Sequence, residues 1–366
     1  MSFFNSASDI DSPVTSTKPR RSFGLILLAI FALGLLAIWV FPTPYVIEQP
    51  GPTFNVLGTD KDVPVITVDG AQSYPTSGNL DLLTVQIVGN RDKTPSWLDV
   101  FVAWSDPAKS VLPLDEVFPA NQTVEQSKAE SSAMMEQSQQ EAIAVALTKL
   151  GYEVPVNIYI SEVQKNSASS GQLVAADFVR SVNGQKVSSI EGLRSLVNAY
   201  DSKTPLKVVV DRSGETKTFD LTPAKDETGA WRLGIIVGYK YEFPVQVNLQ
   251  LADVGGPSGG MMFALGIYDV LTPGDLTGGK YIAGTGTIAA TGSVGPIGGI
   301  QQKMFGASKA GAKYFLAPAD NCNEVVGHIP SGLQVFKISN FDQAILAAKK
   351  IGEGSDLSAL ATCGTN

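Results

Sequence analysis

The sequence is poor in several residue types on which common activities depend. Its 366 residues include 1 His and 2 Cys, and charged residues make up only 17% of the chain. Zinc hydrolases and His-based catalytic triads recruit imidazoles as ligand or base, so a single His disfavours both classes. Two Cys exclude a disulfide-rich scaffold. Any hydrolytic mechanism is therefore expected to use other side chains, and we expect no cofactor.

Positive charge is also scarce. Lys and Arg number 27 against 35 Asp and Glu, which gives a formal net charge of -8. Because binding to nucleic acid requires clustered Lys and Arg that neutralise phosphates, we expect no nucleic-acid partner. Apolar residues, at 44%, are sufficient for large buried cores, and the length predicts two or three folded units.

One long apolar run lies near the N-terminus. Residues 23–41 carry no charge, and at about 1.5 Å per residue they span roughly 28 Å, close to the thickness of a bilayer core. A buried soluble helix normally shows a polar face. The apolar core of a cleaved signal peptide is shorter, roughly 7–15 residues, and ends in small residues. The run therefore predicts an uncleaved transmembrane helix.

The charges on either side of this run indicate its orientation. Lys18, Arg20 and Arg21 precede it and acidic residues follow it, so the positive-inside rule places residues 1–22 in the cytoplasm. This tail is rich in Ser, Thr and Pro and is expected to be disordered. Everything after residue 42 is then extracytoplasmic.

The two cysteines both lie in the C-terminal part of the chain. Outside the cytosol, Cys322 and Cys363 could form one disulfide that ties the C-terminal tail, residues 351–366, to the preceding domain. Two unpaired buried thiols are an equally good interpretation. The sequence leaves both open.

The first external segment, residues 42–124, is predicted to be rich in strands. Alternating apolar and polar residues occur at 63–68 and 80–88, between Gly, Pro and Asp residues. Residues 107–124 lack such a pattern and are expected to be a connection. A helix is predicted next, at about 125–150, because good helix formers continue to a closing glycine.

Residues 125–227 combine that helix with strands around a second helix. Strands are expected at 157–163 and 177–182, helical spacing follows at 190–200, and two further strands flank a Gly turn. This order, with the run AADFVRSVNGQKVSSIEGLRSLV, resembles a bacterial PDZ domain. The resemblance implies peptide capture by strand addition, with a carboxylate-binding loop near 151–155, where no clear family motif is present. A PDZ fold that serves only as a spacer is the alternative.

Glycine becomes dense and charge sparse between residues 255 and 311. Within this block, Ser258 lies in the sequence GGPSGG, directly before an apolar helix expected at 261–271. A serine on a tight turn at a helix start has an accessible hydroxyl near backbone N–H groups that attract negative charge. A plain helix-capping serine would occupy the same position.

Lys303 is the second candidate of this block. It falls in the first turn of a helix that runs to residue 310, before a strand at 314–317. The helix dipole disfavours a cation there, and burial among apolar neighbours would lower the pKa of its amine. A neutral amine close to Ser258 could accept the hydroxyl proton and produce a nucleophile without histidine. Taken alone, an exposed surface lysine is the ordinary interpretation.

Three segments in order favour the catalytic interpretation. GGPSGG, TGTIAATGSVGPIGGIQQK and AGAKYFLAP follow one another at the spacing of the Lon protease catalytic domain, so residues 228–350 resemble that family. The resemblance implies that Ser258 is the nucleophile and Lys303 its general base. It also implies that Thr285, at the start of TGTI, positions the lysine.

The same resemblance implies an oxyanion hole made by backbone N–H groups of Gly256, Pro257 and Ser258. Many family members carry an acid three residues before the serine. Here that position is Gly255, and Asp253 lies two residues further back. Either the site works without the acid, or the pKa of its lysine is set differently.

The order of the parts predicts the function. An anchor, a PDZ-like domain and a Lon-type domain, in a chain of mixed α/β class, resemble the membrane-anchored PDZ–Lon serine proteases of Gram-positive bacteria, which the run YVIEQPGP also fits. Because no ATPase module is present, the resemblance implies an ATP-independent serine endopeptidase of the bacterial cytoplasmic membrane. Its expected substrates are unfolded or flexible proteins and peptides outside the membrane.

Two other classes of function stay open at this point. Gly255, in place of the acid, favours a catalytically inactive binding scaffold in the cell envelope. Ring formation in relatives of the Lon domain would instead suit a structural assembly protein, and a homo-oligomer is compatible with either class.

Overall fold

The computed structural model describes residues 21–120, 122–251 and 254–364, and it describes the side chains of these residues except for 21–23 and 35–40. The chain divides into two compact units. The first unit combines residues 1–47 with 87–120, and the second combines 48–86 with 121–366.

Three helices and a short strand lie in the described part of the first unit, residues 21–47 and 87–120. They are α1 (Arg21–Val40), α2 (Trp97–Trp104), α3 (Leu114–Val117) and β6 (Ser110–Pro113). A capping box starts α2: the Ser96 side chain accepts from the Asp99 N–H, and the Asp99 carboxylate accepts from the Ser96 N–H. The Thr43 hydroxyl donates to the Pro95 carbonyl at 2.9 Å. These bonds hold the start of α2 against the chain that leaves α1.

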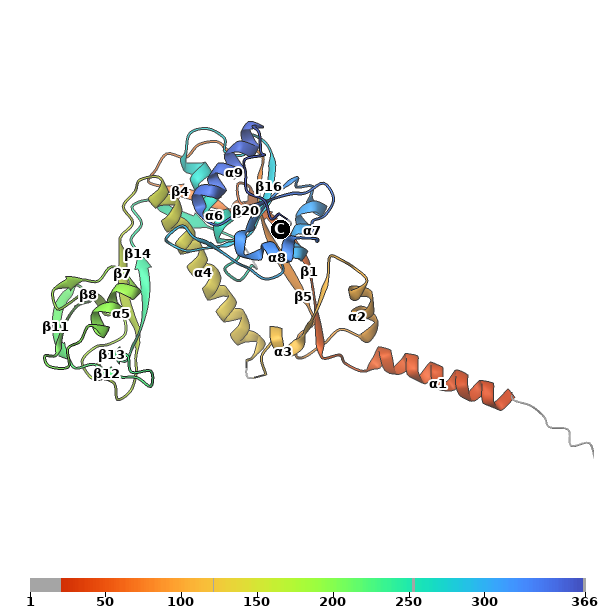
Figure 1. Cartoon of the computed structure of the whole chain (residues 1–366), viewed down its shortest axis with the longest axis horizontal. Coiled ribbons are helices and arrows are strands. Elements are labelled where there is room, and N and C mark those ends of the chain that lie inside the picture. The colour runs from red at the N-terminus through yellow and green to blue at the C-terminus, as the bar shows by residue number, and fades with distance from the viewer. Residues whose placement is uncertain (1–20, 121, 252–253, 365–366) are drawn as a thin grey trace, which may run out of the picture. The chain divides into compact units, whose positions relative to one another are not determined.

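The apolar run predicted to cross the membrane forms α1 (Figure 1). Its large apolar side chains between Leu25 and Leu33 are 52–65% exposed. Over the described residues, no helix has the length and apolar character needed to cross a membrane. The side chains of 35–40 and the predicted cytoplasmic tail up to residue 20 lie outside the described residues.

A mixed sheet forms the framework of the larger domain of the second unit. Within this unit the strand order is β20-β19-β16-β5-β1, and β16 pairs in parallel with both β5 and β19. The strands of this sheet are β1 (Tyr45–Asn55), β5 (Asn79–Val88), β16 (Tyr281–Gly284), β19 (Tyr314–Pro318) and β20 (Gln334–Ile338). The prediction of a separate β-rich segment at 42–124 is therefore corrected. Its two longest strands share a sheet with strands from beyond residue 280.

Helices α4 (Val124–Lys149), α6 (Gly260–Leu271) and α9 (Phe341–Glu353) bury their apolar side chains in the core of this domain. Ile143 and Leu147 of α4 belong to the same core cluster as Phe263 of α6. The sequence placed this helix in the PDZ-like domain. That assignment is wrong because periodicity reveals an apolar face but not the partner that covers it.

The smaller domain, residues 156–241, is an antiparallel sheet covered by α5 (Ile190–Asn198). Its order is β11-β10-β8-β7-β14, and it has its own apolar core. The strands are β7 (Val156–Val163), β8 (Phe178–Val182), β10 (Leu206–Arg212), β11 (Glu215–Leu221) and β14 (Ile235–Tyr241). The predicted boundary after residue 227 is wrong, because β14 pairs with β7 from Ile235 to Tyr241.

The remaining elements are short. They are β2 (Thr59–Asp60), β3 (Val63–Pro64), β4 (Ile66–Asp69), β9 (Gln185–Lys186), β12 (Ala224–Lys225), β13 (Trp231–Arg232), β15 (Gln246–Leu249), β17 (Thr287–Ile288), β18 (Val294–Gly295), the 3-10 helix η1 (Ala319–Asn321) and α8 (Cys322–Val325). Helix α7 (Ile300–Ala310) packs in a second apolar cluster of the larger domain.

The two cysteines are joined. Cys322, the first residue of α8, and Cys363 form a disulfide bond. Of the two interpretations that the sequence left open, the structure contains the disulfide. It ties the C-terminal tail to the larger domain.

Candidate active site

Ser258 lies on a tight turn directly before α6. Gly256 in this turn has φ +81°, a left-handed conformation that glycine adopts without strain. Two residues of α4 hold the turn: the Gly256 N–H donates to the Ser131 carbonyl at 2.8 Å, and the Ser138 hydroxyl donates to the Pro257 carbonyl at 2.8 Å. The backbone of the turn is thereby fixed while the serine itself stays partly exposed.

Lys303 reaches the serine from the first turn of α7. Its Nζ donates to Ser258 Oγ at 2.9 Å and to Thr285 Oγ1 at 3.2 Å. The lysine is 2% exposed, and its neighbours Ile300 and Met304 are fully buried. The structure therefore brings the three predicted catalytic residues within hydrogen-bond distance of one another.

Thr285 follows the end of β16 and is fully buried. Its hydroxyl donates to the Ser258 carbonyl at 3.0 Å, which leaves the same oxygen as acceptor for Lys303. The Gly286 N–H donates to the Ser258 carbonyl at 2.8 Å, and the Gly286 carbonyl accepts from the Met261 N–H at 3.1 Å. Residues 285–286 thus hold the backbone on both sides of the serine turn.

Burial sets the protonation state of the lysine. Desolvation lowers the pKa of Lys303 from 10.5 to about 8, and the negative charge of Glu48 opposes this effect. The neutral amine is therefore populated at mildly alkaline pH, whereas an exposed lysine is almost entirely charged there. A neutral amine at this distance can accept the Ser258 proton.

Glu48 of β1 is a charged residue of the site that the motifs did not single out. Burial raises the pKa of this carboxyl above its ordinary value, and the positive charge of Lys303 opposes this effect only in part. In the sequence Glu48 lies in the run YVIEQPGP, beyond the predicted anchor, and no motif marks it as part of the site. Its approach to the lysine depends on β1 joining the sheet of the larger domain, which no local pattern reveals.

The start of α7 has room for this carboxylate because residue 299 is glycine. Gly299 has φ +68°, and a Cβ added there would lie 2.7 Å from Glu48 Oε1 and 2.6 Å from a methyl carbon of Val85. The partial positive charge of a helix N-terminus favours a nearby carboxylate. Glu48 therefore lies at the end of α7 that carries the lysine.

A buried amide fixes the loop before α7. The Asn321 side chain donates to the Ile297 carbonyl at 2.9 Å and accepts from the Ile297 N–H at 3.0 Å. Asn321 is 1% exposed and directly precedes Cys322 of the disulfide. The disulfide consequently attaches the C-terminal tail beside Asn321, which supports the start of α7, the helix that carries Lys303.

The predicted oxyanion hole needs a correction. Proline has no backbone N–H, so Pro257 cannot donate. The Gly256 N–H already donates to the Ser131 carbonyl. Of the three predicted donors, only the Ser258 N–H has no acceptor among the hydrogen bonds of the described residues.

Gly255, at the position of the missing acid, is exposed and lies against the side chain of Ser131. A Cβ added to Gly255 would lie 2.3 Å from Ser131 Oγ, so a side chain there would displace this serine. Asp253 lies outside the described residues. Among the residues that the structure describes, Glu48 is the acid whose charge acts on the lysine.

The single histidine, His328, is exposed and is not among the bonded partners of Ser258 and Lys303. In the ranges that the structure describes, no group of three or more His, Cys, Asp or Glu side chains is arranged to hold a metal ion. The described groups at this site are Ser258, Lys303, Thr285, Glu48 and the backbone of the serine turn.

Residues 251–349 match the family described as the Lon protease (S16) C-terminal proteolytic domain. Curated Lon proteases of Rickettsia bellii, Campylobacter concisus and Azospirillum brasilense are 31%, 30% and 34% identical to this chain over 117, 152 and 109 residues. This region is a Lon-type proteolytic domain. The aligned parts are 30%, 40% and 29% of this chain but only 15%, 19% and 13% of the relatives. The chain thus matches less than a fifth of their length.

Residues 83–222 match the PDZ domain family. Solved PDZ domains of SdrC-like proteins from Listeria monocytogenes and Listeria innocua are 16% and 18% identical to the chain, with a TM-score of 0.21 for each. They cover 22% of this chain and 85% and 92% of their own. By its family matches, the chain combines a PDZ domain with a Lon-type domain, as the sequence motifs predicted.

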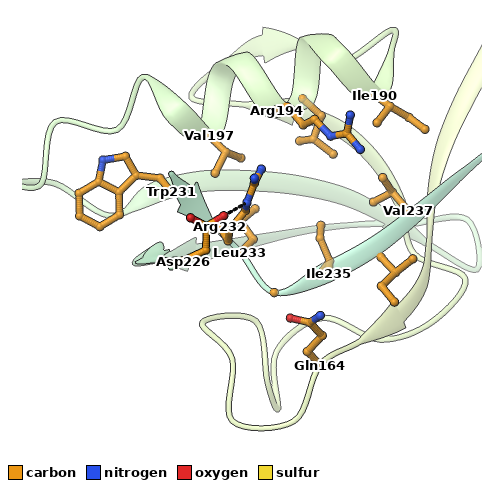
Figure 2. A pocket seen from close by; sticks show the side chains of 13 residues that line it. Gln164, Ile190, Arg194, Val197, Asp226, Trp231, Arg232, Leu233, Ile235 and Val237 are labelled. Carbon is orange, nitrogen blue, oxygen red and sulfur yellow. Dashed lines mark hydrogen bonds and ion pairs between the residues drawn. The ribbon is translucent and has the colours of Figure 1, made fainter. Parts of the chain in front are cut away.

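A groove of about 500 Å³ lies on the PDZ domain between α5 and β14. Figure 2 shows Ile190 and Val197 of the helix on one side and Ile235 and Val237 of the strand on the other. Because β14 is the edge strand of the sheet, its outer side can accept an added strand. Arg194 and the ion pair of Asp226 with Arg232 also line the groove.

The carboxylate-binding loop predicted near residues 151–155 would not precede an edge strand. That segment leads into β7, which has β8 on one side and β14 on the other and thus no free edge. The turn that precedes the edge strand is Leu233-Gly234, and Gly234 has φ +71°. The run Leu233-Gly234-Ile235-Ile236, with one glycine among apolar residues before a strand, is the signal that could have located this edge strand.

Proposed function

We propose that this chain is an ATP-independent serine endopeptidase of the bacterial cytoplasmic membrane, with Ser258 as nucleophile and Lys303 as general base. The observation that carries the proposal is the 2.9 Å distance between Lys303 Nζ and Ser258 Oγ in a Lon-type domain. The lowered pKa of the buried lysine supports its role as a base. A helix-capping serine and a surface lysine would have neither feature.

Acylation begins when neutral Lys303 accepts the proton of Ser258. The serine Oγ attacks the scissile carbonyl carbon, and the oxyanion that forms is stabilised by the Ser258 N–H, a kind of donor worth about 3–4 kcal/mol in better-known proteases. As the C–N bond breaks, the Lys303 ammonium returns its proton to the leaving amine. The products of this step are an acyl-enzyme and a new peptide N-terminus.

Deacylation repeats the same proton transfers with water. Lys303 accepts a proton from a water molecule, the hydroxide attacks the ester carbon, and the proton then passes to Ser258 Oγ as the ester bond breaks. Thr285 acts as a positioning residue, because its oxygen accepts from the lysine and its hydroxyl donates to the Ser258 carbonyl. It keeps Nζ directed at Oγ through both steps.

The proposed substrates are unfolded or flexible chains outside the membrane. The resemblance to PDZ–Lon proteases without an ATPase module favours substrates that need no unfolding motor. The PDZ groove would hold a substrate segment as an added strand along β14, with apolar side chains against Ile190 and Val197. Anchoring by residues 23–41 rests on their uncharged, apolar sequence and on the basic residues before them.

The test uses the full chain in detergent or vesicles, an unfolded protein as substrate and no ATP, with products identified by mass spectrometry. Discrete fragments from the wild type and none from Ser258→Ala are expected. A contaminating protease would cleave the substrate in the Ser258→Ala preparation as well. Equal fragments from the wild type and from Ser258→Ala would therefore refute the proposal. No fragments from the wild type, together with peptide binding to the PDZ domain, would favour the binding scaffold.

A further inference from the structure

Helix α2 presents an apolar face to the outside of its unit. Val100 and Ala103 are buried, at 0% and 1% exposed. Four large apolar side chains on the other sides of the helix are 53–57% exposed: Leu98, Phe101, Val102 and Trp104. A helix on the surface of a soluble domain normally turns polar residues outward. An outward face of this composition indicates a site of contact with a protein or a membrane.

The exposed face of α2 continues into the end of the apolar run. Phe41, directly after α1, is 63% exposed, and Phe41 and Leu98 line one hollow of about 760 Å³. Its lining also includes Val88 and the charged residues Asp92, Lys93 and Asp99. Helices α1 and α2 are in contact and belong to the same compact unit (Figure 1). We call Phe41 and the four exposed side chains of α2 the apolar collar.

The chemistry of the collar suits the boundary between lipid headgroups and acyl chains. The rings of Phe101 and Trp104 pack edge to face at 5.6 Å, and Trp is one of the two residues enriched at membrane interfaces. The one charged residue of the helix, Asp99, accepts from the Ser96 N–H and hydroxyl in the capping box. Its carboxylate is thus engaged at the helix start, away from the Phe101–Trp104 end.

We propose that the apolar collar is a membrane-interface element, which rests in the outer leaflet of the bilayer that residues 23–41 cross. This inference rests on the anchoring proposed above and adds a second point of contact to it. The continuity of the collar with the apolar run selects lipid as the occupant, since the chain leaves the bilayer at Phe41. With α2 seated in the interface, the first unit would have a fixed orientation on the membrane.

The experiment measures the surroundings of one collar residue in the full chain. Because Cys322 and Cys363 are joined, a single added cysteine can be labelled with a polarity-sensitive fluorophore. Phe101→Cys is compared with Val174→Cys, a matched site on the PDZ domain that is 45% exposed. Both variants are reconstituted in vesicles of phosphatidylcholine and phosphatidylglycerol, with and without lipids that carry a quencher near the headgroup. Val102→Cys serves as a second collar probe if Phe101→Cys does not fold.

We expect blue-shifted emission and lipid quenching at position 101, and neither at position 174. Equal emission at both positions, without lipid quenching, would overturn the proposal. A blue shift at 101 that grows with protein density and is insensitive to the lipid quencher would assign the collar to a second copy of the chain and also overturn it.

An alkaline wash of the same vesicles separates this proposal from the anchor. If the chain stays with the vesicles but the label at position 101 is in water, the anchor is supported and the interface element is contradicted. A chain that the wash removes, with position 101 in water beforehand, contradicts both. Retention together with lipid quenching at 101 supports both.

Discussion

Lys303 is buried where a positive charge is disfavoured, and this lowers the stability of the folded chain at neutral pH. Its pKa is about 8 in the folded chain against 10.5 for an ordinary lysine, so the unfolded chain binds this proton more tightly. Below about pH 8 the difference destabilises the folded state by about 3 kcal/mol, and the penalty disappears as pH rises past the unfolded value.

Replacing this lysine by an apolar side chain is therefore expected to stabilise the protein. Lys303→Met should raise the free energy of unfolding at neutral pH by up to about 3 kcal/mol, and by much less above the ordinary lysine pKa. Urea unfolding at the two pH values measures both quantities. An equal gain at both would mean that packing, and not the buried charge, is responsible.

Glu48 should set the pH dependence of the reaction. The base form of Lys303 is neutral, so activity is expected to rise with pH through about 8. The negative charge of Glu48 raises the pKa of Lys303, hence Glu48→Gln should move this limb of the kcat/KM profile to lower pH. Glu153→Gln, an exposed acid elsewhere in the chain, is the control. If this limb of the kcat/KM profile stays at the same pH in Glu48→Gln, the charge of Glu48 does not affect the pKa of Lys303.

Thr285 is expected to act through the position of the lysine. Thr285→Val keeps the volume and removes both hydrogen bonds, to Lys303 and to the Ser258 carbonyl. A decrease in kcat of up to about 100-fold is expected, with KM little changed. Thr285→Ser restores the hydroxyl and should recover most of the activity. If the serine variant is as slow as the valine variant, loss of packing is the cause.

At the scale of elements, the disulfide is expected to stabilise the C-terminal part of the Lon-type domain. Cys322 and Cys363 are separated by 41 positions, a loop for which the chain-entropy model gives about 4 kcal/mol. Cys363→Ser should lower the free energy of unfolding by about 2–4 kcal/mol. Urea unfolding with and without reductant checks this. Reductant should lower the free energy of unfolding of the wild type to that of Cys363→Ser and leave that of the variant unchanged.

The elements also differ in how far the sequence predicted them. Helix α4 was expected at about 125–150 and runs from Val124 to Lys149, because Thr123 and Gln126 form a capping box and helix formers follow. Its place in the larger core was not predicted. β14 was missed as a strand of the PDZ sheet, because its partner β7 is more than 70 residues earlier. Local patterns carry no information on such a pairing.

At the scale of the whole molecule, the smaller domain, residues 156–241, is an insertion in the larger domain. α4 precedes the insertion, α6 follows it, and both contribute to one core. Val156 and Tyr241, where the insertion begins and ends, face each other in antiparallel register, and such partners lie about 5 Å apart. The two ends could therefore be joined by a few residues without moving the rest of the chain.

Excision of the insertion is the corresponding test. Replacing residues 156–241 by a short Gly-rich linker should leave a folded Lon-type domain that still cleaves a small unfolded peptide, because the two cores are separate. Binding of peptides to the groove should be lost. Thermal unfolding and peptide cleavage measure the outcome. A deletion variant with no cooperative unfolding would mean that the larger core depends on the PDZ domain.

The sequence by itself determined the two domain families and the group of Ser258, Thr285 and Lys303, because each lies in a short segment whose pattern is contiguous. It also predicted the apolar run that forms α1. Only the tertiary structure decided that the charge of Glu48 acts on the lysine, that Cys322 and Cys363 are bonded, that Gly256 is already occupied as a donor, and that the PDZ groove lies along β14. Each of these depends on which distant segments pair or pack, and strand pairing and burial are set by the whole chain and not by the local order of residues.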